Sequence, residues 1–386
     1  TLYEKEYPDQ KIKYDYAYNS QDAFNENSDE DGYFTQLNLK LLTEDVGDVF
    51  MSGGTWSDVY HRFKTDLFED LKPMIEKDPS FSELDTTMLH GMTIDGKTCG
   101  LPLSGIYFYT EVNTALCKKL GIDLDWTRAT WDDVIQLAER LEGTDYYVFA
   151  TDTPDRIFVR MLISNMPDLI DLQAKKVDLR QPWFLALLEQ WKQAMQTSHL
   201  YGERRLIPRS GLAEQSLLCI DTRTGKAWQG DYILTYEQIN FAFGDGVRYA
   251  PLFSGEKHTN RTAYSEDLYS IMQSSQNKEA AWQFLSFLMR RDVQQLRVLR
   301  NAELNMEARN AEIEQAISAE PPEDQPMARR YSEDIKNVYQ SVDTFYDMNK
   351  LKEDLFPPLL QYLSGEMTLD DALTQAERDL WISINE

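Results

Sequence analysis

Apolar and polar positions recur along the chain with two periods, and their order predicts an α/β protein. Period-two alternation and short apolar runs predict strands, whereas spacings of three and four residues predict amphipathic helices. Strands are expected at Lys11–Tyr18, Gly47–Gly54, Asp95–Ser104, Tyr146–Ala150, Ser216–Ile220 and Arg248–Leu252. Helices are expected at Tyr33–Thr43, Thr114–Leu120, Thr130–Leu141, Ile157–Asn165, Pro182–Thr197, Asn277–Met289 and from Thr368 to the end.

Capping residues sharpen the boundaries of two of these helices. Gly121 follows Leu120, where a glycine ends a helix without steric cost. Thr130 is a good N-cap, and the carboxylates of Asp132 and Asp133 suit the positive end of the helix dipole. The segment Pro321–Pro326 is expected to separate two helical blocks.

Length and composition bound the architecture. The 386 residues exceed the roughly 250–300 that one hydrophobic core usually supports, so two lobes are expected. Hydrophobic residues make up 42% of the chain, enough to bury a sizeable core. The 65 acidic residues outnumber the 39 basic ones and give a net charge of −26, spread along the chain. This balance argues against nucleic acid or an anionic membrane as a partner.

Targeting and redox signals are weak. No run of about 18 apolar residues occurs, so no membrane span is expected. The start, Thr1–Pro8, has the pattern of a helix end running into a strand, which predicts a trimmed or processed N-terminus without a signal peptide. Cys99, Cys117 and Cys219 fit no zinc or redox spacing and are interpreted as small buried apolar residues, with no disulfide framework.

Five stretches carry a resemblance to a known family. Taken in order, they resemble the extracytoplasmic solute-binding proteins of family 1 type, which deliver sugars to ABC importers. The likeness covers most of the chain, and its motifs describe the fold better than the ligand. The stretches are Leu42–Phe50, Gly96–Pro102 followed by Asn113–Asp123, Thr130–Asp132, Ser275–Trp282 and Gly365–Ala372.

The resemblance implies an α/β, two-lobed periplasmic-binding-protein-like type II fold with a hinge and an interlobe cleft. Lobe 1 would comprise residues 1–108 and 255–305, and lobe 2 residues 109–254 and 306–386. The hinge would lie near Tyr107–Val112 and Pro251–Gly255. A cleft between lobes is where ligands preferentially bind.

The resemblance also implies a function and a location. The protein would capture a sugar or oligosaccharide and deliver it to a membrane-embedded ABC importer permease, as a monomer without catalysis or cofactor. It would lie outside the cytoplasm, lipid-anchored at the cell surface or periplasmic, with the signal segment absent from this chain.

A sugar site needs aromatic rings that stack on C–H faces and polar groups that bond hydroxyls. In lobe 1 the candidates are Ser52, Thr55 and Trp56, although a core tryptophan is the competing interpretation. Near the hinge, only one of Tyr107 and Tyr109 is expected to face the cleft.

Lobe 2 offers two further groups of candidates. Asp152 and Arg156 follow a predicted strand and could bond hydroxyls, while Trp228, Asp231 and Tyr232 combine aromatic and polar side chains. A surface loop is the competing interpretation of the second group. Four other tryptophans are interpreted as packing residues on amphipathic helices: Trp131, Trp191, Trp282 and Trp381.

Two other functions stay open. The main rival is a receptor for a peptide or another non-sugar solute on the same fold, because a fold does not fix a ligand. A glycoside-processing enzyme is the weaker alternative, since no pair of acidic residues stands in a distinctive motif. The four histidines have no metal-ligand spacing, and no phosphate-binding glycine loop occurs.

Overall fold

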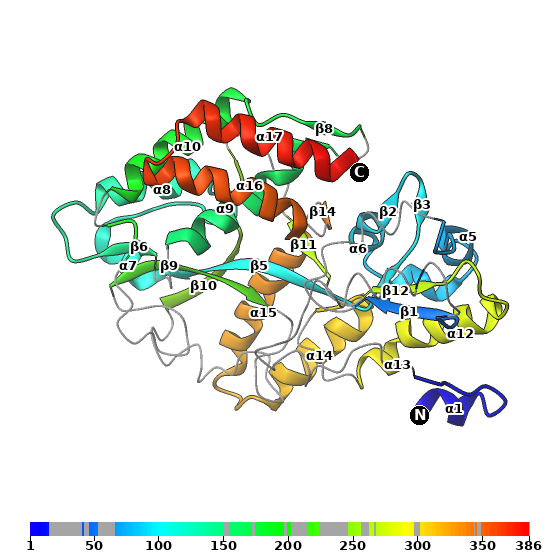
Figure 1. Cartoon of the computed structure of the whole chain (residues 1–386). Coiled ribbons are helices and arrows are strands. Elements are labelled where there is room, and N and C mark those ends of the chain that lie inside the picture. The colour runs from blue at the N-terminus through cyan, green and yellow to red at the C-terminus, as the bar shows by residue number, and fades with distance from the viewer. Residues whose placement is uncertain are drawn as a thin grey trace, which may run out of the picture.

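The computed structural model describes residues 1–14, 41, 46–52, 66–149, 154–171, 174–196, 199–201, 215–223, 246–255, 262–265, 268–296, 302–342, 344–345 and 349–385. Helices and strands alternate along the first part of these ranges, and helices dominate the last part (Figure 1).

The helices are α1 (Leu2–Glu6), α5 (Lys72–Ile75), the 3-10 helix η1 (Pro79–Glu83), α6 (Thr86–Gly91), α7 (Thr114–Leu120), α8 (Trp131–Arg140), α9 (Pro154–Leu169), α10 (Pro182–Met195), α12 (Lys278–Met289), α13 (Arg291–Gln294), α14 (Met306–Ala319), α15 (Gln325–Gln340), α16 (Asn349–Ser364) and α17 (Leu369–Asn385). The strands are β1 (Val49–Ser52), β2 (Thr93–Ile94), β3 (Lys97–Thr98), β4 (Leu101–Pro102), β5 (Ser104–Asn113), β6 (Tyr147–Phe149), β7 (Ile170–Asp171), β8 (Lys176–Val177), β9 (Ser216–Arg223), β10 (Val247–Pro251), β11 (Thr262–Tyr264), β12 (Leu268–Ile271), β13 (Ala302–Glu303) and β14 (Thr344–Phe345).

Two of the four sheets among the described residues organise the fold, and the other two are the two-stranded pairs β2-β3 and β7-β8. A three-stranded sheet has the order β1-β12-β4, and a seven-stranded sheet has the order β14-β11-β5-β9-β6, with β10 and β13 also paired to β5. Because β4 ends at Pro102 and β5 begins at Ser104, the chain passes from the small sheet to the large one almost without a break. Figure 1 shows β5 crossing the middle of the molecule between the two halves.

Two hydrophobic cores lie on opposite faces of β5. Phe108 and Val112 belong to the first core, which also holds side chains of α7 to α10, α16 and α17. Tyr107 and Tyr109 belong to the second core, with side chains of α6, α12, α15 and the small sheet. The alternation follows from strand geometry, since successive side chains point to opposite faces. One strand therefore contributes to both cores.

Local sequence signals set several element ends as predicted. The side chain of Asn113 accepts a hydrogen bond from the backbone N–H of Leu116 at 3.0 Å, so α7 begins there. Gly121 ends α7 in the left-handed conformation, with φ of +65°. Thr130 and Asp133 form a reciprocal capping box at the start of α8. These predicted boundaries are confirmed.

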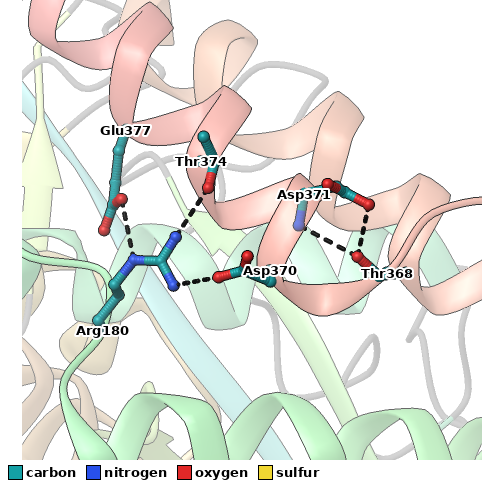
Figure 2. A network of polar contacts seen from close by, with 6 residues as sticks. All are labelled: Arg180, Thr368, Asp370, Asp371, Thr374 and Glu377. Atoms are coloured by element: carbon teal, nitrogen blue, oxygen red, sulfur yellow. Dashed lines mark hydrogen bonds and ion pairs between the residues drawn. The ribbon is translucent and has the colours of Figure 1, made fainter.

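The C-terminal helix α17 is fastened to the segment before α10 by one arginine. The guanidinium of Arg180 donates to Asp370 Oδ1 at 2.6 Å, Thr374 Oγ1 at 2.8 Å and Glu377 Oε2 at 3.1 Å (Figure 2). The three acceptors follow one stripe of the helix. This network anchors α17 over the first core, to which Leu373, Ala376 and Leu380 contribute.

Three expectations are wrong. Lys11–Tyr14, the described part of the first expected strand, lies in no strand. The helix expected to begin at Ile157 begins at Pro154, so Arg156 lies inside α9, because proline is favoured at the first position of a helix. Trp381 is 58% exposed and is no core residue, whereas Trp131 and Trp191 are fully buried.

Among the described residues, no helix combines the length and the apolar character needed to cross a membrane.

Candidate functional site

Two strands of the large sheet end at the same edge. β6 and β9 are parallel, with Phe149 opposite Leu218, so their carboxyl ends point the same way. The chain leaves β6 at Phe149 toward predicted site residue Asp152, and leaves β9 at Arg223 toward Trp228. In open α/β sheets, ligands bind outside the carboxyl ends of strands. Two separate groups of predicted ligand residues thus come directly after strands that end at the same edge of the large sheet.

One end of the three-stranded sheet, at Ser52, Leu268 and Pro102, lies near the start of β5. Ser52, the last residue of β1, pairs with Leu268, and Leu268 pairs in turn with Pro102 of β4. Two residues after Pro102, β5 begins, and its Tyr107 pairs with Arg223 at the end of β9. The carboxyl end of β9 therefore lies beside β5, and the carboxyl end of β1 lies one strand away from β4, which precedes β5 in the chain.

Most of the predicted ligand residues fall outside the described residues. They are Thr55, Trp56, Asp152, Trp228, Asp231 and Tyr232. The backbone of Ser52 and that of Arg156 are described, in β1 and α9, but their side chains are not. As ligand contacts, these eight residues stay a prediction.

Tyr107 and Tyr109 are placed differently from the prediction. Both rings are buried in the second core, at 2% and 1% exposure, so the expectation that one of them faces a cleft is wrong here. Residues two apart on a strand share a face, which is why both rings point the same way. Tyr109 packs edge-on against Tyr249 of β10, with 5.5 Å between ring centroids. Tyr107 and Tyr109 are therefore core residues of β5, the strand that follows directly after the small sheet.

A buried charged cluster that sequence reasoning missed surrounds the Tyr107 hydroxyl. That hydroxyl donates to Asp85 Oδ2 at 3.2 Å and accepts from Arg309 Nη1 at 3.4 Å, while Arg309 Nη2 lies 3.3 Å from the same carboxylate oxygen. The guanidinium also lies over the Tyr339 ring, 4.5 Å from its centroid. Burial raises the pKa of Tyr107, so this hydroxyl stays protonated.

The electrostatics of Arg309 favour its charged form. Burial by itself lowers the pKa of the guanidinium, but Tyr107, Tyr339 and Asp85 outweigh it, and the pKa is raised above its ordinary value. A permanently charged, buried arginine needs such partners. No local sequence pattern indicates this cluster, because 224 positions separate Asp85 from Arg309.

The second missed pair joins β10 to α15. Arg248 donates to Asp334 through Nε at 2.6 Å and Nη2 at 2.5 Å, and the backbone N–H of Tyr249 donates to the same carboxylate at 3.1 Å. The hydrogen bond to Asp334 raises the pKa of Arg248. Asp334 is buried. The sequence does not predict this, because aspartate is mostly exposed and Asp334 stands among polar residues of α15.

The described part of the chain holds neither a group of metal-ligating side chains nor paired cysteines. It contains no group of three or more histidine, cysteine, aspartate or glutamate side chains placed to hold a metal ion. Cys99 and Cys117 are buried and Cys219 is half-buried, all three as free thiols. The interpretation as buried apolar residues is confirmed for the first two only.

Comparison with known proteins adds independent information. Residues 1–187 match the sequence model of the bacterial extracellular solute-binding protein family. No curated protein is significantly similar in sequence.

Solved structures match over nearly the whole chain. An ABC substrate-binding protein from Listeria monocytogenes in complex with cycloalternan is 18% identical, with a TM-score of 0.61 and coverage of 99% of this chain and 94% of that one. The GacH receptor of Streptomyces glaucescens, solved with acarbose, is 15% identical, with a TM-score of 0.59 and coverage of 99% and 92%. A maltose-bound protein of T. maritima is 17% identical, with a TM-score of 0.58 and coverage of 99% and 94%. At these identities the likeness shows the fold. The predicted α/β, two-lobed periplasmic-binding-protein-like fold is confirmed.

Proposed function

We propose that the chain is a bacterial extracellular solute-binding protein, which captures a sugar or oligosaccharide between two lobes and delivers it to a membrane-embedded ABC importer. The match of residues 1–187 to the sequence model of that family supports this proposal. The observation that carries this proposal is the arrangement of strand ends. The carboxyl ends of β1, β6 and β9 lead into the segments that contain the predicted aromatic and polar ligand residues.

The chemistry of the ligand follows from those residues. Trp56 and Trp228 supply planar rings for the C–H faces of a sugar, and Asp152, Arg156 and Asp231 supply groups that bond hydroxyls. Ser52, Thr55 and Tyr232 complete the proposed contacts. The three structural relatives named above carry cycloalternan, acarbose or maltose, which favours a neutral carbohydrate over a peptide here as well.

The mode of action is binding and release without catalysis or a cofactor. Ligand contacts to both lobes would favour a shut state, and the ligand can shift that equilibrium only by its differential affinity for the two states. The lobes would follow the division at residues 1–108 with 255–305 and 109–254 with 306–386. The protein would act as a monomer outside the cytoplasm, lipid-anchored or periplasmic.

Calorimetric titration of neutral mono- and oligosaccharides tests the ligand assignment. Trp56→Ala and Trp228→Ala should each weaken binding at least about ten-fold, because a lost stacked aromatic removes about 1.5 kcal/mol or more. Trp381→Ala is the matched control, since Trp381 is an exposed tryptophan on α17, and it should leave the affinity unchanged.

Three results would count against the proposal. Binding of a peptide without binding of any sugar would favour the rival receptor. Release of chromophore from a nitrophenyl glycoside, at a rate proportional to protein concentration, would establish catalysis. Equal loss of affinity in all three tryptophan variants would remove the predicted residues from the site.

A further inference from the structure

One side of β5 is closed where the strand passes from the small sheet to the large one. On that side, Tyr339 of α15 packs against Tyr107, with 4.6 Å between ring centroids, and Arg309 of α14 donates a hydrogen bond to the Tyr107 hydroxyl. Figure 1 shows α14 and α15 on one side of β5, and α9, α16 and α17 on the other. A cleft between the two halves can therefore reach β5 only from the side opposite to α15.

The even-numbered positions of β5 face that opposite side. Phe108 and Val112 belong to the first core, whereas Tyr107 and Tyr109 belong to the second, as alternation along a strand requires. Ile106 shares the face of Phe108 and is 3% exposed, yet it packs in none of the hydrophobic clusters that the described residues form. On this face the first core thus ends at Phe108, and the start of β5 extends beyond it.

Ser104, the first residue of β5, carries an unpaired hydroxyl on the same face as Ile106. Ser104 is fully buried, and within the described part of the chain its Oγ makes no hydrogen bond. An unpaired buried hydroxyl is unfavourable for the fold, and few such groups occur in native proteins. A ligand hydroxyl that reaches Ser104 would supply the missing bond.

Arg160 of α9 lies at the other end of this row. Its side chain is half-buried, and its guanidinium lies over the Phe108 ring, 4.7 Å from the centroid. Arg160 stands four positions after the predicted ligand residue Arg156, so the two positions lie on one face of α9. A guanidinium carries N–H donors in a rigid fork, which matches two adjacent oxygen atoms. Arg160 can therefore bond neighbouring hydroxyls of a sugar.

We propose that Ser104, Ile106 and Arg160 form the floor of the sugar site. The Ser104 hydroxyl and the Arg160 guanidinium bond sugar hydroxyls, while Ile106 between them contacts the apolar C–H face. The proposal rests on the proposed function in one respect, namely that the lobes part and admit a sugar to Ser104 and Ile106, which are buried in this conformation.

The length of the floor bears on the size of the ligand. From Ser104 to Phe108, over which Arg160 lies, an extended strand rises about 13 Å. This length exceeds a single sugar ring, so a monosaccharide would contact only one polar end. The floor therefore favours a disaccharide or a longer sugar.

Calorimetric titration with maltose, acarbose and cycloalternan tests the two polar ends. For the probe that binds the parent protein most tightly, Ser104→Ala should weaken binding about five-fold, the loss of one neutral hydrogen bond. Arg160→Gln should weaken it about ten-fold or more, because bonds from a charged donor are stronger. Without sugar, Ser104→Ala should not lower the midpoint of thermal unfolding, since the removed hydroxyl has no partner among the described residues.

The chain offers a matched control for each variant. Thr110→Val serves for the serine, because Thr110 is also fully buried with an unpaired Oγ1 in the described part, but lies between Phe108 and Val112 of the first core. Arg290→Gln serves for the arginine, because Arg290 likewise lies over a phenylalanine ring, that of Phe287, at 5.1 Å, beside α12 and away from β5. Neither control should change the affinity.

A thiol placed on the floor tests the geometry without any sugar. Ile106→Cys and Val112→Cys each replace a buried aliphatic side chain on the same face of β5, in a Cys219→Ala background. Parting of the lobes exposes the floor, whereas the first core is exposed only on unfolding. Ellman's reagent should therefore modify Ile106→Cys at least about ten-fold faster than Val112→Cys.

Equal thiol rates in the two cysteine variants overturn the proposal. So does unchanged affinity in Ser104→Ala or Arg160→Gln, and a lowered unfolding midpoint in Ser104→Ala without loss of affinity would assign that hydroxyl to the fold alone. If none of the three sugars binds the parent protein, the proposed sugar binding fails, while the thiol rates still decide whether β5 forms the floor of the cleft.

Discussion

A β-carbon built on Gly255 would lie 2.6 Å from Oδ1 of Asn165, closer than such atoms approach in folded proteins. It would also lie 3.0 Å from the ring of Trp183. Asn165 is fully buried in α9, and Gly255 follows β10 at the end of the second predicted hinge segment. The chain at this crossing is thus fixed by close packing against two helices.

Gly255→Ala should therefore destabilise the protein. The extra methyl group overpacks the contact, and such insertions cost about 1–3 kcal/mol. Urea unfolding followed by tryptophan fluorescence measures the change. In a double-mutant cycle, Asn165→Ala should relieve part of the cost, because it removes the oxygen that the methyl group meets. Strict additivity of the two changes would show that they do not meet.

Thr130→Ala should weaken the start of α8. The threonine hydroxyl accepts from the Asp133 N–H at 3.2 Å, and the Asp133 carboxylate accepts from the Thr130 N–H at 2.9 Å. Losing a cap of this kind costs about 1 kcal/mol. Thr130→Ser keeps the hydroxyl and should stay within about 0.5 kcal/mol of the parent in the same denaturant titration. Equal losses in both variants would point to the methyl group and not to the cap.

Stability should depend on pH through Asp78. Burial raises the pKa of this carboxyl, but hydrogen bonds from Ser80 and Ser286 outweigh it, so the folded pKa lies below the ordinary value. A depressed carboxyl pKa stabilises the fold above the unfolded pKa of about 3.9, and the contribution is lost as the pH falls through the folded pKa.

Ser286→Ala removes one of those bonds and should cost up to about 1 kcal/mol at pH 7. Its difference from the parent should shrink as the pH is lowered below about 4, measured by urea titrations at several pH values. Ser318→Ala is the control, because the Ser318 hydroxyl donates to the carbonyl of Glu314 and has no titrating partner. A Ser286→Ala difference that stays constant with pH would contradict the assignment.

Two of the three thiols should be inert in the folded protein. Burial raises the pKa of Cys99 and of Cys117 to about 11, so at pH 8 only about one in a thousand of each is the reactive thiolate. Ellman's reagent should therefore modify at most Cys219 quickly, and all three only in guanidinium. Rapid modification of three thiols in the native protein would contradict this burial.

The sequence predicted elements best where their ends depend on nearby residues. Asn113, Gly121 and Thr130 set helix ends through bonds that span three or four positions, and the structure confirms them. It predicted side-chain burial less well. Trp131 and Trp381 both occur in amphipathic helices, but Trp131 packs against Trp191 of α10 and is fully buried, whereas Trp381 is 58% exposed.

The sequence by itself determined the α/β order of elements, their caps and the family resemblance, because those signals are written in neighbouring residues. Only the tertiary structure brought Asp85 to Arg309 and Arg248 to Asp334, pairs separated by 224 and 86 positions. Such pairs form where distant segments pack around β5 and its neighbour β10, and the burial of Asp85, Arg309 and Asp334 exists only after that folding.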